Sequence, residues 1–254
     1  MTSRQDERPV ALITGASRGI GAATARELAR RGYALALAAR TAADLQALAA
    51  QLSAHGSPAL PIPTDLRRPP EVSRLARIAL AHFGRVDVLV NNAGVGVGNR
   101  QFARTDDDDI RAIMAVNLEA PIALTRALLP GMLERRRGAI VFVASIAGQI
   151  GLPASTLYSA TKFGLRGFAI GLRREVLRQG IGVTIVSPGF IDTDMTAWLR
   201  GFPKAPPELV ARAIADAITR PRREVIVPGY YRLAIWLERA LPWLADALLS
   251  QRGR

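Results

Sequence analysis

Short apolar segments alternate with amphipathic ones along almost the whole chain, and this alternation limits the possible folds more than any other feature. Seven apolar segments are typical of buried strands, namely Val10–Thr14, Tyr33–Ala39, Ala59–Ile62, Val86–Asn91, Ala139–Ala144, Gly182–Ser187 and Glu224–Val227. Helical patterns lie between or beside them, at about 19–31, 41–54, 69–83, 106–136, 155–179 and 206–219. Apolar strands separated by helices indicate a parallel sheet covered on both faces. The sequence therefore predicts a single-domain α/β fold, a doubly wound parallel sheet of about seven strands, with ligands bound at its carboxyl edge.

A glycine-rich turn joins the first predicted strand to the first predicted helix. It reads Thr14-Gly15-Ala16-Ser17-Arg18-Gly19-Ile20-Gly21. Gly15 permits a tight turn, Gly19 the close approach of a pyrophosphate, and Gly21 close packing of helix on strand. Free N–H groups at the start of the helix would bind phosphate. In this setting the turn predicts a dinucleotide site, to which Ser17, Arg18 and Ile20 also belong.

The end of the second predicted strand indicates which dinucleotide binds. An acidic residue about twenty positions after the glycine turn would bind the adenosine ribose hydroxyls and repel a 2′-phosphate. This chain has Arg40 and Thr41 there, and Arg18 lies in the glycine turn. Because two guanidinium groups suit a phosphate dianion, we predict NADP(H) in preference to NAD(H). The alternative for Arg40 is a solvated surface arginine.

A tyrosine and a lysine at helical spacing indicate the chemistry. Tyr158 and Lys162 stand four residues apart, and Ser145 lies thirteen positions before the tyrosine. Of the 34 lysines and arginines only Lys162 and Lys204 are lysines, so this pairing arises rarely by chance. On a helix the phenol and the ammonium would share a face and could serve one site.

The charge of Lys162 is expected to act on the Tyr158 phenol. One positive charge about 4 Å away, at an effective dielectric constant near 20, is worth roughly 4 kcal/mol, or about three pKa units. This predicts a tyrosine pKa lowered towards neutrality, where a group works well as a general acid or base. The alternative is that Ser145 only ends a strand and Tyr158 only packs.

Together these motifs make the chain similar to the short-chain dehydrogenase/reductase family, over essentially its first 230 residues. It also has Asn91-Asn92-Ala93-Gly94 after the fourth strand, Asn117 in the next helix and Pro188-Gly189 after the sixth strand. The resemblance implies a Rossmann-like subunit, often a homodimer or homotetramer. It also implies reversible hydride transfer between a nicotinamide and an alcohol or carbonyl.

The resemblance implies roles for individual residues. Ser145 would hydrogen-bond the substrate oxygen, and Tyr158 would donate or remove its proton. Lys162 would bind the nicotinamide ribose hydroxyls, while Asn117 would hold a water in a proton relay. Other cofactor contacts would be Asp65 and Leu66 at the adenine, Asn91, Ala93 and Gly94 beside the adenosine, and Pro188, Gly189, Ile191 and Thr193 around the nicotinamide.

Charge and composition exclude some classes of partner. The net charge is +13, which would attract anionic cofactors or membrane surfaces. The arginines are scattered, however, and their densest runs, 135–137 and 222–223, lie at the ends of predicted elements. We therefore expect no nucleic-acid partner. With no cysteine and two histidines, we expect no metal site.

The segments that follow Ser145 and Gly189 predict an apolar substrate. They contain Ile146, Ile150, Leu152, Phe190, Met195, Trp198, Leu199 and Phe202. We expect an apolar cleft with about 194–206 as a short mobile cover. The substrate would be a hydrophobic ketone, aldehyde or secondary alcohol, of lipid or steroid type. The alternative is that some of these residues only pack the cover.

The chain is expected to divide into a catalytic domain, 1–228, and an apolar helical tail, 229–254. The tail is interrupted by charges and by Pro242, so it would not span a bilayer. Three alternatives stay open: contact with a membrane surface, with a partner subunit, or with the substrate cleft. The polar N-terminus is unlike a secretory signal, so we expect a cytoplasmic protein, with peripheral membrane association as an option.

The sequence as a whole predicts an NADPH-dependent carbonyl reductase or alcohol dehydrogenase. Two alternatives are kept. One is an isomerase or dehydratase that uses the same fold and transient oxidation. The other is a non-catalytic NADPH-sensing binding protein, against which the complete set of Ser145, Tyr158 and Lys162 argues.

Overall fold

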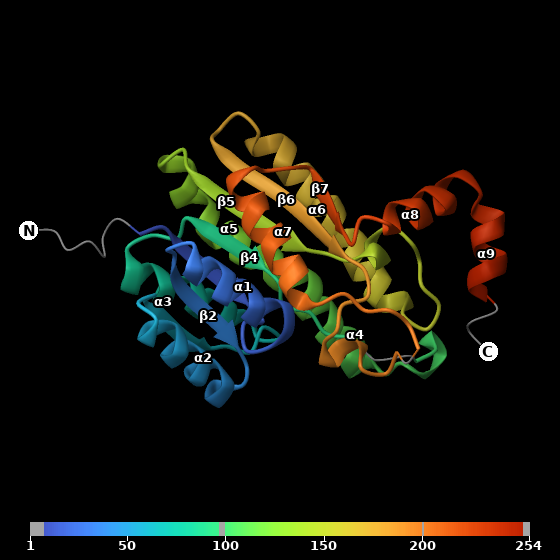
Figure 1. Ribbon diagram of the computed structural model, residues 1–254, viewed down its shortest axis with the longest axis horizontal. Helices are drawn as coiled ribbons and strands as arrows, with labels where there is room; N and C mark the ends of the chain where they lie inside the picture. Colours follow the sequence, from blue (N-terminus) through green and yellow to red (C-terminus); the bar gives the residue numbers. More distant parts are fainter. Residues whose placement is uncertain (1–7, 97–99, 200, 251–254) are drawn as a thin grey trace, which may run out of the picture.

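A computed structural model describes residues 8–96, 100–199 and 201–250, and arranges them as a parallel sheet between two layers of helices (Figure 1). The strand order is β3-β2-β1-β4-β5-β6-β7. The strands are β1 Val10–Thr14, β2 Ala34–Ala39, β3 Ala59–Pro63, β4 Val88–Asn91, β5 Gly138–Val143, β6 Ile181–Pro188 and β7 Glu224–Val227. All seven predicted strands are confirmed. The order reverses between β1 and β4, which opens a crevice at the carboxyl ends of these strands.

Two hydrophobic cores hold the layers together, one on each face of the sheet. One is covered by α1 (Gly19–Arg30), α2 (Ala42–Ala54) and α7 (Pro207–Thr219), the other by α3 (Pro69–Phe83), α5 (Ala120–Glu134) and α6 (Thr156–Val176). Successive strand residues point to opposite faces, so Leu12 enters one core and Ile13 the other. Because both faces are buried, the strands are continuously apolar in the sequence.

The helix expected over 106–136 is confirmed over Asp107–Glu134, and it contains a π-helical turn. It consists of α4 (Asp107–Met114), a π-helical turn over Ala115–Glu119, and α5. Such turns insert one residue into a helix and are frequent at functional sites. Here the turn contains Asn117, which the structure buries completely. The acidic run before it caps α4, since Asp106 accepts a hydrogen bond of 2.8 Å from the Asp109 backbone.

The segment Asp107–Glu134 is, within the described residues, long and apolar enough to cross a membrane, with a mean hydropathy of 1.4. Its apolar side chains Leu124, Leu128 and Met132 lie in the core against the sheet. The core helix of a soluble protein passes the same test of length and composition. The segment therefore carries no argument for a membrane span.

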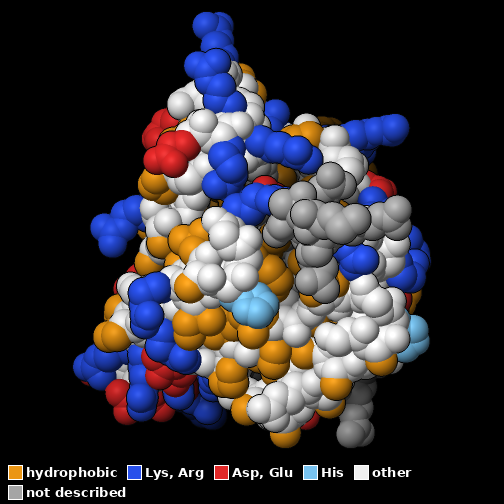
Figure 2. All heavy atoms as spheres, turned by 90° about the vertical axis from the view of Figure 1, so that its left-hand side faces the viewer, with side chains coloured by type: hydrophobic (Ala, Val, Ile, Leu, Met, Phe, Trp, Pro, Cys, Tyr) orange, Lys and Arg blue, Asp and Glu red, His pale blue; other side chains and the backbone are white. Residues whose placement is uncertain are grey.

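Basic side chains are distributed in several groups over the surface. Figure 2 shows the side of the molecule at the left of Figure 1, where blue groups are separated by acidic, apolar and neutral side chains. On the part of this face that is coloured by side-chain type, the basic side chains form no single continuous stripe.

The tail forms two helices, α8 (Tyr231–Ala240) and α9 (Pro242–Ser250), at the end of the molecule opposite α2 and α3 (Figure 1). Their inner side contributes the buried residues Ile235 and Ala245. Their outer side is apolar as well, since Leu233, Trp236 and Trp243 are 60–71% exposed. Residues 251–254 of the predicted tail lie outside the described residues.

The first turn of α1 packs so closely on the glycine turn that position 21 has no room for a side chain. A Cβ atom at this position would overlap the carbonyl oxygen of Gly15, and that atom belongs to the backbone. We expect Gly21→Ala to lower the free energy of unfolding by about 3 kcal/mol, measured by urea denaturation. Gly167→Ala is the control, because this α6 glycine has open space around it and alanine is the better helix former. Equal stability of the two variants would contradict the packing role.

Candidate active site

One large cavity of about 1070 Å³ lies at the carboxyl edge of the sheet. Most of the predicted site residues line it: Gly15, Ser17, Arg18, Gly19, Ile20, Arg40, Thr41, Asp65, Leu66, Ala93, Gly94, Ser145, Tyr158, Lys162, Pro188, Gly189, Ile191 and Thr193. Gly21, Asn91 and Asn117 are not among its lining residues. The cavity therefore joins the predicted dinucleotide and catalytic groups in a single site.

The glycine turn leaves room for a ligand and directs backbone groups to it. Gly15 and Gly19 have φ values of 66° and 54°, in the left-handed region that favours glycine. A Cβ atom on Gly15 would lie 2.9 Å from the Ala93 Cα, and one on Gly19 would lie 3.1 Å from the Thr193 Cγ2. No side chain caps the start of α1, so its first N–H groups remain for a phosphate.

Thr14 and Asn92, which sequence reasoning did not include in the site, hold the turn in place. The Thr14 Oγ1 accepts hydrogen bonds from the backbone N–H groups of Asn92 at 3.0 Å and Ala93 at 3.1 Å. The Asn92 amide donates in turn to the Thr14 carbonyl at 2.9 Å. The sequence signal that could have identified them is a polar residue at the end of an apolar strand, as Thr14 is for β1, or directly after it, as Asn92 is for β4. These bonds fix the loops after β1 and β4 against each other.

Arginines surround the end of the cavity near β2. Arg40 is an exposed residue of the cavity wall. Arg67 binds Asp65 at 2.6 Å, and this hydrogen bond is the main cause that lowers the pKa of the Asp65 carboxyl. Arg18 forms an ion pair of 2.7 Å with Asp194, but both side chains are at least 70% exposed. Such a pair contributes at most about 1 kcal/mol, so a phosphate could compete for Arg18.

The catalytic set comes from the end of β5 and from α6. Tyr158 and Lys162 lie one turn apart on α6, and the Lys162 Nζ is 5.5 Å from the centre of the Tyr158 ring. Lys162 is almost completely buried and donates a hydrogen bond of 2.9 Å to the Val143 carbonyl. The Ser145 Oγ accepts a hydrogen bond of 3.1 Å from the Ala147 N–H. All three side chains face the same cavity.

The prediction of a tyrosine pKa near neutrality is wrong for the protein by itself. Burial raises the pKa of Tyr158 to about 12, and the hydrogen bond from Ser145 offsets this only in part. Burial lowers the pKa of Lys162 to about 8. The physical reason is that the cavity wall removes water from both charged forms. The phenol therefore carries its proton at neutral pH and is ready to donate it.

Asn117 and Asn91 are buried behind the cavity wall. The Asn117 Oδ1 accepts from the Val95 N–H at 2.8 Å, and its Nδ2 donates to the Val95 carbonyl at 2.9 Å and the Thr161 hydroxyl at 3.2 Å. The side chain thus anchors the loop after β4 next to Lys162. Asn91 donates to the Thr125 hydroxyl at 3.3 Å, and its Oδ1 has no partner among the described residues. The water relay through Asn117 stays a prediction.

The other end of the cavity is apolar. Ile146, Leu152, Phe190, Met195, Trp198, Leu199 and Phe202 line it, together with Leu249 from the tail. Met195, Trp198 and Phe202 of the predicted cover are 41–46% exposed. Ile150 lies instead in a small cluster with Ile146 and Ile235. The predicted apolar cleft is therefore present, and the tail contributes to it.

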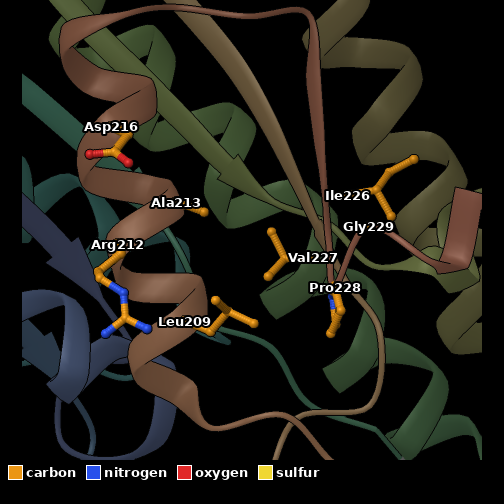
Figure 3. A pocket seen from close by; sticks show the side chains of 8 residues that line it. All are labelled: Leu209, Arg212, Ala213, Asp216, Ile226, Val227, Pro228 and Gly229. Atoms are coloured by element: carbon orange, nitrogen blue, oxygen red, sulfur yellow. The ribbon is translucent and has the colours of Figure 1, made fainter.

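A second pocket, of about 420 Å³, lies between α7 and β7 (Figure 3). Its lining residues are Leu209, Arg212, Ala213, Asp216, Ile226, Val227, Pro228 and Gly229. Asp216 is paired at 2.8 Å with Arg31, the residue that follows α1, so this carboxylate takes part in a surface contact between α7 and the end of α1. None of the predicted site residues lines this pocket, and most of them line the larger cavity.

The fold is a doubly wound parallel sheet of the Rossmann-like class, and its large cavity lies at the carboxyl edge of the sheet. Residues 9–202 match the family described as short chain dehydrogenase. The chain therefore belongs to the short-chain dehydrogenase/reductase family.

Two relatives illustrate the match in sequence. The chain is 38% identical to the ketoacyl reductase HetN of Nostoc sp. (strain PCC 7120) over 222 residues, which cover 85% of this chain and 77% of that protein. It is 40% identical to the 3-oxoacyl-[acyl-carrier-protein] reductase FabG of Escherichia coli (strain K12) over 190 residues, or 75% of this chain and 76% of that protein. The protein is an oxidoreductase of this family.

Two solved structures illustrate the match in fold, and each contains a nicotinamide dinucleotide. A short-chain dehydrogenase from Sphingobium yanoikuyae in complex with NADPH has a TM-score of 0.83 and 29% identity, covering 94% of this chain and 96% of that chain. A family member from Burkholderia phymatum in complex with NAD has a TM-score of 0.86 and 25% identity, covering 95% and 96%. Both neighbours contain a nicotinamide dinucleotide, and both share the fold of this chain.

Proposed function

We propose that the protein uses NADPH to reduce the ketone of an apolar substrate, with 3-oxoacyl thioesters as the substrate class. The observation that carries this proposal is the single cavity with Ser145, Tyr158 and Lys162 between a glycine turn and an apolar end. The names of HetN and FabG, both ketoacyl reductases, support the substrate class. The protonated phenol of Tyr158 supports a role as proton donor to a carbonyl oxygen.

The residues of the chain act on the carbonyl oxygen. The bound dinucleotide supplies the hydride. Ser145 donates a hydrogen bond to the oxygen and orients it, and Tyr158 transfers its phenolic proton to the same atom. Lys162, held by the Val143 carbonyl, offsets the negative charge that the phenol then carries. Asn117 keeps the loop after β4 in position beside the lysine.

The test is consumption of NADPH with the N-acetylcysteamine thioesters of 3-oxobutyrate and 3-oxododecanoate, followed at the absorbance band of the reduced nicotinamide. We expect the band to disappear and a 3-hydroxyacyl product to form in equal amount. Binding of NADPH with no consumption across these and other ketones would replace this proposal by the nucleotide-sensing alternative. A product formed with no net change in NADPH would favour the isomerase or dehydratase.

Arg40 is proposed to select NADPH by binding its 2′-phosphate. We expect Arg40→Asp to weaken NADPH binding roughly 10- to 150-fold, because a charge-assisted hydrogen bond of about 1.5–3 kcal/mol is lost. NADH binding should be equal or tighter in this variant, as measured by fluorescence titration. Arg77→Ala is the control, since this exposed arginine on α3 is not among the cavity-lining residues. Wild-type protein that uses NADH at least as efficiently as NADPH would contradict the assignment.

Partners and location complete the proposal. We propose a homodimer or homotetramer in the cytoplasm, with no nucleic-acid partner, and light scattering after size exclusion measures the assembly. Peripheral membrane contact through the exposed face of α8 and α9 is a separate possibility. Co-sedimentation with anionic vesicles of the full chain tests it.

A further inference from the structure

The tail contacts both loops that form the apolar end of the cavity. Leu249 of α9 lines the cavity directly. Ile235 of α8 is only 5% exposed and packs with Ile146 and Ile150, which follow Ser145 in the chain. The ring of Tyr231 lies against Gly189, where a Cβ atom would overlap it. The tail therefore touches the substrate end of the site through three separate contacts.

A polar network links α8 to the loop after Ser145, and it is exposed at Arg239 and buried at Gln149. Arg239 donates to the Gln149 Oε1 at 2.7 Å, and the Gln149 Nε2 donates to Glu224 at 2.8 Å. Glu224 also accepts from the Ser187 hydroxyl at 2.7 Å and from Arg166 at 3.0 Å. Gln149 is 7% exposed, so loss of Arg239 would leave its oxygen buried without this donor. The network thus couples the position of α8 to that of the loop.

The tail is also separate from the part of the chain that defines the family. The family match ends at residue 202, whereas α8 and α9 begin at 231 and 242. Of the described tail residues, Leu249 lines the cavity, and it packs against the cluster of Ile146, Ile150 and Ile235. A wall in this position contacts the part of a substrate that lies beyond its reacting carbonyl.

We propose that α8 and α9 form the outer wall of the substrate site, and that Leu249, positioned through Arg239 and Gln149, sets preference for long apolar chains. This inference rests on the proposed function. An apolar chain that extends from the carbonyl would run along Leu249 and the cover residues Trp198 and Phe202. A short substrate would not reach Leu249, so contact with the wall would not strengthen its binding.

The test compares a twelve-carbon with a four-carbon substrate. In Leu249→Trp the indole is expected to fill the space that the acyl chain of the long substrate would occupy. We expect the ratio of kcat/KM for the thioester of 3-oxododecanoate over that of 3-oxobutyrate to fall at least about tenfold, or about 1.4 kcal/mol. Leu248→Trp is the matched control, because its neighbour Leu248 is 53% exposed and does not line the cavity. Equal ratios in the two variants, or no chain-length preference in the wild type, would overturn the inference.

The positioning role of Arg239 has its own pair of variants. We expect Arg239→Ala to raise KM for the long substrate about fivefold with a smaller change in kcat, and Arg239→Lys to restore part of the loss. Arg232→Ala is the control, since this exposed arginine of α8 makes no side-chain hydrogen bond found among the described residues. An equal loss of kcat on both substrates would indicate a merely structural role and reject the positioning one.

A binding measurement separates failure of this inference from failure of the proposed function. Lauroyl and butyryl thioesters have no ketone to reduce, so calorimetry in the presence of NADP⁺ reports chain preference without turnover. Suppose that the wild type reduces no 3-oxoacyl thioester but binds the lauroyl thioester more tightly than the butyryl one, and that Leu249→Trp removes this preference. The role of the tail as a wall is then supported and the proposed function is rejected. If reduction occurs but Leu249→Trp keeps the preference, the wall is rejected and the function stands.

Discussion

Tyr158→Phe is expected to lower kcat for NADPH-dependent reduction about a thousandfold. A positioned general acid contributes roughly 10²- to 10⁴-fold, and phenylalanine cannot donate a proton. The phenol is suited to this role because burial raises its pKa to about 12, so it holds its proton throughout the neutral range. The ring itself is kept in the variant, and so is its contact with the cavity wall. NADPH affinity should therefore stay within about threefold of the wild type.

The measurement combines single-turnover absorbance with fluorescence titration of NADPH. Tyr33→Phe is the control, because Tyr33 is a half-buried tyrosine at the start of β2 and is not a cavity-lining residue. This control should keep its kcat within about twofold. Full activity of Tyr158→Phe would refute the proton-transfer role. Loss of NADPH binding in that variant would instead assign the tyrosine to the cofactor.

Lys162→Met is expected to lower kcat/KM about a hundredfold. The ammonium offsets the charge on the phenol after proton transfer, and methionine keeps most of the length of the side chain with no charge. Urea unfolding of the variant shows whether the fold is kept. Lys204→Met is the matched control, because Lys204 is the other lysine of the chain and is outside the cavity lining. Undiminished turnover in Lys162→Met would remove the basis of the proposed mechanism.

The same lysine predicts a pH dependence with a definite sign. Burial lowers the pKa of Lys162 to about 8, so the side chain is an ammonium below this pH and a neutral amine above it. Lys162 is predicted to donate a hydrogen bond to the nicotinamide ribose hydroxyls, and such a bond is stronger from a charged donor than from a neutral one. NADPH binding by the wild type should therefore weaken about fivefold between pH 7 and pH 9. Binding by Lys162→Met should not change with pH over this range, and a parallel decline in both proteins would contradict the assignment.

The fold and most of the site were predictable because their signals are local. An apolar strand followed by an amphipathic helix can be recognised within about twenty residues, and the glycine turn lies at one such junction. Tyr158 and Lys162 are one helical turn apart, so their spacing alone placed them on one face. The predicted strand ends differ from the observed ones by at most two residues.

The features that the sequence did not reveal depend on contacts between distant parts of the chain. The π-helical turn at Ala115–Glu119 goes with the burial of Asn117 against the loop after β4, which periodicity does not show. Arg18 meets Asp194 across 176 positions, and no local pattern pairs them. The tyrosine pKa was expected to fall because only the neighbouring charge was counted. Burial, the larger effect here, raises it.

By itself the sequence determined the order of strands and helices, the family, and the residue types available for hydride and proton transfer. Only the tertiary structure decided that the phenol is protonated, that Asn117 is an anchor, and that Leu249 reaches the cavity about a hundred positions after Ser145. The physical reason is that secondary structure follows from neighbours within a few residues. Burial, pKa and the shape of a cavity follow from all the segments that pack around a point.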